Sequence, residues 1–94
     1  MAIVTFNDKQ TERIWNGEFS KKLPREIHKR VWAKLSVLDA ATELRDLRIP
    51  SSNRLEALKG NRKGQHSIRV NDQFRICFEW NGGKVTGVEV TDYH

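Results

Sequence analysis

The sequence is poor in the features that make disulfides, metal clusters and membrane spans. Cys77 is its single cysteine, which excludes a disulfide within the chain and a thiolate metal cluster. No apolar run approaches the length of about 20 residues that a membrane-spanning helix needs. The segment Met1–Phe6 also lacks the basic region and the long apolar region of a secretory signal. We therefore expect a reduced, cytoplasmic protein with no membrane partner.

What the chain does contain is charge, with a clear basic excess. Its 94 residues include 17 Lys and Arg against 12 Asp and Glu, a formal net charge of +5. Hydrophobic residues make up 37%, which suits the core of one small folded domain over residues 1–94. The basic excess favours a polyanionic partner, with nucleic acid slightly ahead of two alternatives, an acidic protein partner and a charge surplus that serves solubility.

Helical patterns occupy the first half of the chain. A β-branched segment, Ala2–Phe6, predicts an opening strand, after which Asn7 or Asp8 can cap a short helix that Gly17 ends. A second, amphipathic helix is predicted from Pro24 to Asp39, because apolar residues recur there at helical spacing. The apolar stripe consists of Leu23, Ile27, Val31, Leu35 and Leu38.

The second half alternates apolar and polar residues, as β-strands do. A turn is predicted at Asn71-Asp72, a tight hairpin at Asn81-Gly82-Gly83 and a bulge near Gly87. The predicted strands are Leu55–Ala57, His66–Val70, Phe74–Trp80 and Lys84–Tyr93. We expect an α+β fold in which the N-terminal strand and two helices pack on one face of an antiparallel sheet.

The predicted strand register places two arginines together. The apolar residues of the central hairpin must face the helices, because a slip of one residue would bury Arg69 and Arg75. Both arginines are therefore expected on the opposite, open face of the sheet.

Short stretches in a fixed order carry a resemblance to a known family. They are Asp39-Ala40-Ala41-Thr42-Glu43-Leu44, Leu58-Lys59-Gly60-Asn61-Arg62-Lys63-Gly64, Ser67-Ile68-Arg69-Val70, Phe74-Arg75-Ile76-Cys77-Phe78 and the terminal Asp92-Tyr93-His94. With them the chain resembles the HigB toxins of the RelE/ParE superfamily over essentially its whole length. The resemblance implies a RelE-like fold, ribosome-dependent cleavage of mRNA in the ribosomal A site, contact with rRNA, and neutralisation by a HigA-like helix-turn-helix antitoxin. That antitoxin also represses the shared operon, so operator DNA is reached only through it.

The residues suit RNA cleavage without a metal. In that reaction the 2′-OH of the RNA attacks the neighbouring phosphate, which requires a base, cations around the phosphate and an acid for the leaving oxygen. The histidines His28, His66 and His94 are predicted on different elements, and no carboxylate pair has the spacing of metal ligands. We therefore expect neither a metal nor another cofactor.

Arg75 is the first candidate for holding the scissile phosphate, because a guanidinium binds phosphate through paired hydrogen bonds. The alternative is a salt bridge to Glu79 on the same face of the strand. Lys59 matches a phosphate-contacting lysine of the family, although a solvated turn lysine fits the residues equally well. Further basic residues are predicted to bind RNA by general attraction: Arg54, Arg62, Lys63 and Arg69. For Arg69, pairing with a cross-strand acid is an equal alternative.

Proton transfer is assigned to four more residues through the resemblance. Glu56 stands where better-known HigB proteins have a histidine that assists proton transfer; it can act as a base or orient Lys59 or Arg75. His94 can serve as acid or base near neutral pH, Asp92 can fix its imidazole, and Tyr93 can stack on a base or donate a proton. The predicted catalytic set is Glu56, Lys59, Arg75, Asp92, Tyr93 and His94.

A protein that binds without cutting RNA is the competing hypothesis. ParE-type relatives share the fold but act on DNA gyrase, and a plain nucleic-acid-binding module is the third interpretation. The terminal Asp92-Tyr93-His94 and the pair Lys59 and Arg75 favour the nuclease, whereas Glu56 favours the binder. The tryptophans are interpreted as core or antitoxin-interface residues: Trp15, Trp32 and Trp80.

Overall fold

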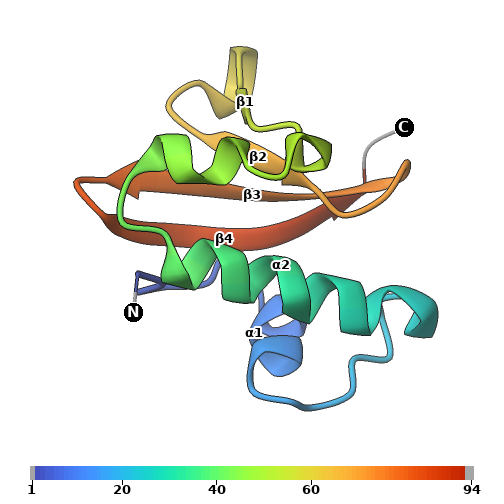
Figure 1. The fold of residues 1–94 in the computed structure, drawn as a ribbon. Helices are drawn as coiled ribbons and strands as arrows, with labels where there is room; N and C mark the ends of the chain where they lie inside the picture. The colour runs from blue at the N-terminus through green and yellow to red at the C-terminus, as the bar shows by residue number, and fades with distance from the viewer. Residues whose placement is uncertain (1, 93–94) are drawn as a thin grey trace.

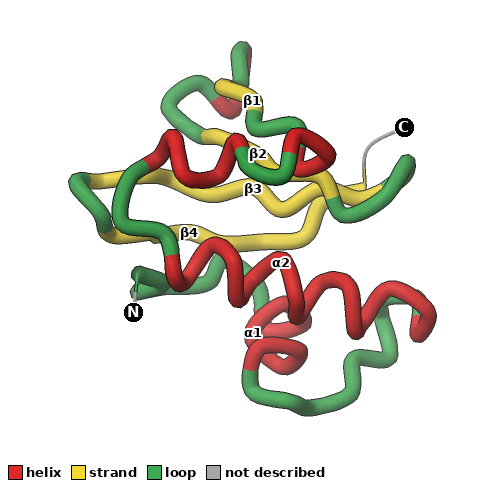
Figure 2. Tube along the Cα trace, viewed as in Figure 1, coloured by secondary structure: helices red, strands yellow, loops and turns green. Residues whose placement is uncertain are grey.

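The computed structural model describes residues 2–92, which form a layer of helices against one antiparallel sheet (Figure 1; Figure 2). The sheet has four strands in the order β1-β2-β3-β4, each antiparallel to its neighbour. The strands are β1 (Glu56–Ala57), β2 (His66–Arg69), β3 (Phe74–Asn81) and β4 (Lys84–Asp92). The predicted α+β architecture, with two helices on one face of the sheet, is confirmed.

The opening segment runs beside β4 but forms less strand than predicted. Ile3 and Phe6 make isolated parallel bridges with Val85 and Val88, and the backbone N of Asn7 donates to the carbonyl of Val88 over 2.9 Å. The pairing is interrupted because β4 bulges between the two bridges, and a straight segment cannot follow it without a break. The segment nevertheless covers the outer edge of β4, which would otherwise expose unpaired backbone groups.

Helix α1 (Lys9–Trp15) begins and ends where the sequence indicates. The Asp8 carboxylate accepts a 2.6 Å hydrogen bond from the backbone N of Thr11, and Gly17 follows the helix with a φ of +81°. Helix α2 (His28–Ala40) is entered through one 3-10 turn, η1 (Arg25–Ile27), which Pro24 precedes. The predicted second helix is therefore present, with a tighter first turn.

Short 3-10 turns carry the chain from α2 across the sheet to β1. They are η2 (Leu44–Arg48) and η3 (Ser51–Asn53); a fourth, η4 (Gly60–Arg62), follows β1. The start of η2 is capped by Asp46, whose carboxylate accepts hydrogen bonds from the backbone N of Glu43 (3.0 Å) and Thr42 (3.1 Å). These two bonds, Glu43 first, lower the pKa of Asp46 below its ordinary value.

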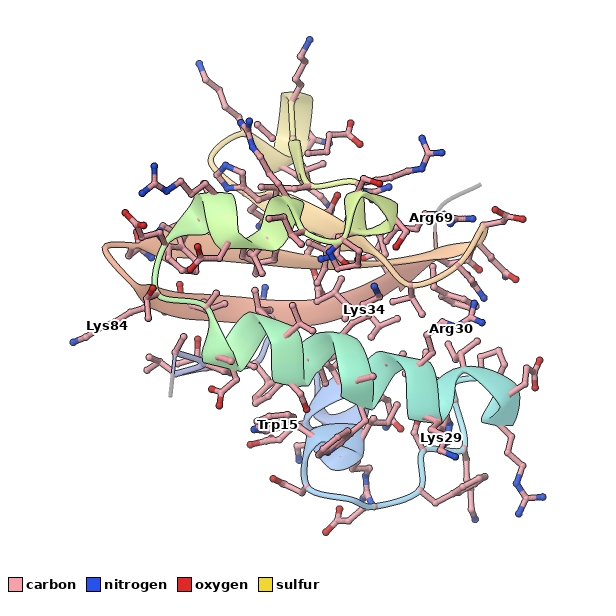
Figure 3. The ribbon with its side chains drawn as sticks, in the orientation of Figure 1. Trp15, Lys29, Arg30, Lys34, Arg69 and Lys84 are labelled. Carbon is pink, nitrogen blue, oxygen red and sulfur yellow. The ribbon has the colours of Figure 1, made fainter. Side chains whose placement is uncertain are left out.

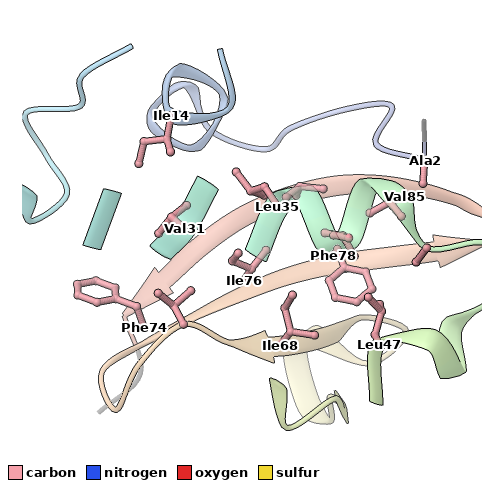
Figure 4. Packing of buried hydrophobic residues seen from close by; sticks show 14 of the residues in the cluster. Ala2, Ile14, Val31, Leu35, Leu47, Ile68, Phe74, Ile76, Phe78 and Val85 are labelled. Atoms are coloured by element: carbon pink, nitrogen blue, oxygen red, sulfur yellow. The ribbon is translucent and has the colours of Figure 1, made fainter. Parts of the chain in front are cut away.

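The core lies between the helices and the sheet (Figure 4). Helix α2 contributes Val31, Leu35 and Leu38, none of which has any exposed surface. The sheet contributes the inward set of the predicted register, including Ile68, Ile76, Phe78, Val85 and Val88, all fully buried. Removal of this apolar area from water is the main driving force for holding the two layers together.

The bulge predicted near Gly87 is present. Cys77 pairs with Glu89 and Glu79 with Thr86, so two residues of β4 face the single residue between them in β3. Gly87 supplies the extra residue with a φ of +62°, a conformation that favours glycine. Because of the inserted residue, Val85 and Val88, which are three positions apart in β4, both face the core.

No helix within residues 2–92 combines the length and the apolar character that crossing a membrane requires.

Candidate functional site

The sheet face away from the helices carries a transverse row of side chains, one from each strand. Glu56 pairs with Ser67, Ser67 with Cys77, and Cys77 with Glu89. Ser67 and Cys77, at the centre of the row, have no exposed surface. The row brings residues far apart in the chain into one line across the sheet.

The centre of this face is closed, which corrects the expectation of an open face. Arg62 of η4 donates a 2.7 Å hydrogen bond to the carboxylate of Glu89 and a 3.0 Å bond to the side chain of Gln65. Leu58, which the alternation places on this face, is also buried. The loop after β1 therefore folds back over Ser67 and Cys77. The side chain of Arg62, predicted to attract RNA, is joined to Glu89 in this closure.

Arg75 lies beside the closed centre, and its guanidinium is held by groups that include Ser67, Arg54 and Glu56. Its Nε donates to the hydroxyl of Ser67 over 2.7 Å, and its Nη2 donates to the carbonyl of Arg54 over 2.5 Å. The Glu56 carboxylate is 3.8 Å from Nη2. Among the described residues, Arg75 forms its ion pair with Glu56 and not with Glu79, which was the alternative. The arginine side chain is only 12% exposed, so its position is well defined.

The carbonyl that binds Arg75 depends on an unusual backbone conformation. Arg54 ends η3 in the left-handed region, with φ +46° and ψ +54°. This conformation costs energy for a residue with a side chain, and it persists only where the surroundings hold it. The fully buried Asn53 anchors the preceding turn, because its amide donates to the carbonyls of Leu47 (3.2 Å) and Ile49 (3.3 Å).

A cleft of about 310 Å³ opens next to Arg75. Its lining consists of Arg54, Arg69, Asn71, Asp72 and Arg75. Arg69 and Arg75 are cross-strand partners, as predicted, and Arg69 forms an ion pair with Asp72. Three guanidinium groups against one carboxylate leave the cleft positively charged, which suits an anionic ligand such as a phosphate.

The end of β4 leads directly past this cleft. Thr91 pairs with Arg75 across the strands, and Asp92, the last residue of β4, accepts a 3.1 Å hydrogen bond from the side chain of Gln73. The predicted catalytic residues Tyr93 and His94 lie outside the described residues. The described part of β4 ends at Asp92, at the end of the sheet where Thr91 pairs with Arg75.

The remaining predicted residues are divided between the cleft and the neighbouring loop. Glu56 and Arg54 contact Arg75, and Arg69 lines the same cleft. Lys59 and Lys63 lie at the two ends of η4 with exposed side chains. The loop thus offers exposed positive charge, whereas the cleft holds the guanidinium of Arg75 through hydrogen bonds. Within residues 2–92, no three His, Cys, Asp or Glu side chains are arranged to hold a metal ion.

Ser67 is a site residue that the sequence reasoning missed. It looks like an ordinary small strand residue, and its importance follows from the register that places it diagonal to Arg75. The signal was available in the turn at Asn71-Asp72, which fixes that register.

A second feature, on the helical side, is an apolar groove between α1 and α2. It has a volume of about 390 Å³ and is lined by Ile14, Gly17, Glu18, Phe19, His28, Lys29 and Trp32. Phe19 is 54% exposed and Trp32 48% exposed, which is unusual for large apolar side chains. Trp15 lies with its ring centroid 6.1 Å from that of Trp32 and packs against the core, as does Trp80.

Comparison with known proteins identifies the family. The model of a family described as "RelE-like toxin of type II toxin-antitoxin system HigB" matches residues 4–94. Toxin HigB-1 of Vibrio cholerae is 44% identical over 89 residues, which cover 94% of this chain and 90% of that protein. A protein from Proteus vulgaris named endoribonuclease HigB is 29% identical over 92 residues, 98% of this chain and 99% of its own length.

The fold is shared with more distant toxins. The structure of a YoeB–YefM complex from Staphylococcus aureus superimposes with a TM-score of 0.62 at 16% identity, covering 100% of this chain and 99% of that one. A heterotetrameric complex of the YoeB–YefM toxin–antitoxin from the same organism gives a TM-score of 0.61 at 17% identity. At such identities the likeness supports the RelE-like fold alone. The family match and the Vibrio relative carry the assignment: the chain belongs to the HigB family of RelE-like toxins of type II toxin–antitoxin systems.

Proposed function

We propose that residues 1–94 are one toxin domain, an endoribonuclease that acts in the cytoplasm by cutting mRNA in the A site of the ribosome. The observation that carries this proposal is the guanidinium of Arg75, fixed in a cleft that two further arginines line. The relative from Proteus vulgaris, named as an endoribonuclease, supports the same activity. In this proposal the ribosome holds the mRNA in an ordered conformation, and the cleft contacts only a small part of it.

The proposed reaction uses the 2′-OH of the RNA. A base removes the proton of this hydroxyl, its oxygen bonds to the adjacent phosphorus, and the bond from phosphorus to the 5′-oxygen breaks while an acid protonates that oxygen. The products are a 2′,3′-cyclic phosphate and a 5′-hydroxyl. Arg75, and Lys59 from the neighbouring loop, neutralise the charge that grows on the pentavalent phosphate. Side chains supply the positive charge in this scheme, so it needs no metal or cofactor.

The proton-transfer groups are assigned to the end of the chain. His94 acts as acid or base, Asp92 orients its imidazole, and Tyr93 stacks on a base or donates a proton. Glu56 is given a different task. Its carboxylate is 3.8 Å from Arg75 and exposed to water, an arrangement that suits orientation of the guanidinium better than proton transfer.

Further basic residues extend the proposed RNA contact. Lys63, Arg54 and Arg69 attract the mRNA and the surrounding rRNA, in a way that weakens as salt rises. Arg62 contributes through the loop that it holds in place rather than through free charge, because its guanidinium bonds Glu89.

The proposed partner is a HigA-like helix-turn-helix antitoxin, through which the chain reaches operator DNA. The apolar groove between α1 and α2 supports a protein partner of this kind, since Phe19 and Trp32 expose large apolar surface there. Cationic side chains flank the aromatic surface, among them Lys29 in the groove and Arg25, 5.9 Å from the Phe19 ring. The complementary antitoxin segment is therefore amphipathic and acidic.

The deciding experiment maps the 5′ ends of mRNA on translating ribosomes. Three proteins are compared: the wild type, Arg75→Ala, and a chain that lacks His94. We expect cleavage by the wild type only. Equal cleavage by all three would overturn the assigned site, and no cleavage by any would favour a toxin that acts by binding.

A further inference from the structure

Beside the cleft and partly in its lining, three cationic side chains from two elements gather on one side of the molecule (Figure 3). Arg30 and Lys34 are one turn apart on α2, which places them on the same face of the helix. Arg69 comes from the end of β2 and also lines the Arg75 cleft. The group therefore continues the positive surface of the cleft onto the helix.

Lys34 is held in place rather than free in solvent. Its Nζ donates a 2.5 Å hydrogen bond to Oδ1 of Asn53, a fully buried side chain. The amide N of Asn53 is bonded to two backbone carbonyls, so the oxygen must point toward the lysine. The next residue, Arg54, offers the carbonyl that binds Arg75. Lys34 is thus connected to the cleft through two adjacent residues.

The positive charges of Arg30, Lys34 and Arg69 repel one another. Partial burial lowers the pKa of Lys34 below its ordinary value, and the charges of Arg30 and Arg69 lower it further. Acidic side chains that the structure places against this group include Asp72, which pairs with Arg69, and Glu26, which shares a shallow pocket with Arg30. The repulsion between like charges held close together is relieved when an anion binds between them.

We propose that Arg30, Lys34 and Arg69 form a second phosphate site, which binds an RNA backbone phosphate next to the one held at Arg75. The inference rests on the proposed function only in taking RNA as the ligand. It assigns Arg30 and Lys34, which lie on a helix outside the catalytic cleft, to substrate binding. Cleavage chemistry is not needed to detect the site.

The test measures binding of a short, fluorescently labelled single strand of 2′-O-methyl RNA, which cannot react because its 2′-oxygens are blocked. The dissociation constant is determined over a range of salt concentrations for the wild type, Arg30→Gln and Lys34→Gln. We expect each variant to bind several-fold more weakly and to lower the slope of log K against log salt by about 0.7, the loss of one phosphate contact to a single strand. Lys84→Gln is the matched control, because it removes the same charge at the β3–β4 hairpin, the other end of β3 from Arg69.

A second arm asks which RNA supplies the phosphate. The same variants are sedimented with ribosomes that carry no mRNA, again across salt. A change confined to the short strand assigns the phosphate to the substrate, as proposed, whereas a change confined to ribosome binding assigns it to rRNA and overturns the placement next to Arg75. Slopes that match the wild type in both arms, or a Lys84→Gln effect of equal size, would overturn the site.

Two controls keep the result interpretable. Arg30→Gln leaves the bond from Lys34 to Asn53 intact, so weaker binding by that variant does not come from a disturbed turn. Thermal unfolding of each variant reports any loss of folding. Wild-type cleavage with unchanged slopes in Arg30→Gln would refute the second site and leave the nuclease standing, whereas altered slopes in a chain that cuts no mRNA would refute the nuclease alone.

Discussion

The Nε of Arg75 donates a 2.7 Å hydrogen bond to the hydroxyl of Ser67, a residue with no exposed surface. A buried hydroxyl cannot move away from the guanidinium without leaving a cavity, so the bond fixes both the position and the plane of the arginine. A planar guanidinium binds phosphate through two parallel bonds only when its plane is set, which makes Ser67 a positioning residue for the proposed reaction.

Ser67→Ala should slow cleavage while the protein stays folded. Loss of a hydrogen bond to a charged group costs about 1.5–3 kcal/mol, and we expect a rate of single-turnover mRNA cleavage lower by about tenfold to hundredfold. The control is Ser36→Ala, whose hydroxyl on α2 bonds the carbonyl of Trp32, away from the cleft. Equal rates for wild type and Ser67→Ala would remove Ser67 from the site.

Glu56→Gln separates orientation of Arg75 from proton transfer. A group that transfers a proton contributes about a hundredfold or more, whereas loss of a 3.8 Å ion pair whose carboxylate is exposed has a small effect. We expect cleavage within about tenfold of the wild type and tighter RNA binding at low salt, because the negative charge beside Arg75 is removed. The control is Glu79→Gln, which removes the same charge from the face of β3 that carries Arg75. A fall in rate of a hundredfold or more would make Glu56 a proton-transfer group.

Trp32→Glu should weaken binding of the antitoxin and leave cleavage unchanged. The substitution places a carboxylate in the apolar groove and removes exposed aromatic surface, so the complex should dissociate faster by at least about tenfold. Kinetic binding assays with the cognate antitoxin measure this. Ile49→Glu alters an equally apolar residue that is 78% exposed outside the groove, and it should bind normally. Normal antitoxin binding by Trp32→Glu would exclude the groove as the interface.

Asp46→Asn should make the thermal stability less dependent on acid pH. Hydrogen bonds from the backbone of Glu43 and Thr42 hold the pKa of Asp46 below its unfolded value of 3.8, so ionisation of this group favours the folded state. The contribution is complete above that value and is lost as pH falls through the folded pKa. Melting curves should therefore show the variant less stable than the wild type at pH 7 and the difference shrinking in acid. A constant difference across pH would contradict the assignment.

Gly87→Ala should destabilise the fold more than Gly82→Ala. Both glycines have positive φ, +62° and +58°, so each alanine should cost about 1–2 kcal/mol in backbone energy. At Gly87 the added Cβ also meets the Asn7 side chain at 3.3 Å, whereas nothing lies within 4 Å of a Cβ at Gly82. Each kcal/mol should lower Tm by about 4–8 °C in a domain of this size. Equal melting temperatures would show that the Asn7 contact adjusts freely.

Local patterns were sufficient to predict most of the fold. The Asp8 cap, the apolar stripe of α2 and the alternation in β3 each depend on a few neighbouring residues, and each is confirmed. The sequence also predicted the register that places Arg69 opposite Arg75, because one face of the sheet must be apolar. The opening strand was overestimated, since its pairing depends on the bulge in a strand whose paired residues lie 82 positions later in the chain.

The environment of Arg75 could not be predicted in the same way. Its contact with the carbonyl of Arg54 joins residues 21 apart and depends on a left-handed backbone conformation in a residue that is not glycine. The bond between Arg62 and Glu89 joins residues 27 apart, across the whole width of the sheet. Neither has a periodic signal in the sequence, because both depend on the path of a loop that is fixed by tertiary contacts.

The bond between Arg62 and Glu89 also restricts the shape of an RNA that can bind on this face of the sheet. It forms a ridge beside Arg75, with Leu58, Ser67 and Cys77 buried beneath it. A rigid double helix laid across the strands has to approach Arg75 past this ridge. A single strand can turn at each phosphate, so this covered face suits single-stranded RNA better than paired RNA.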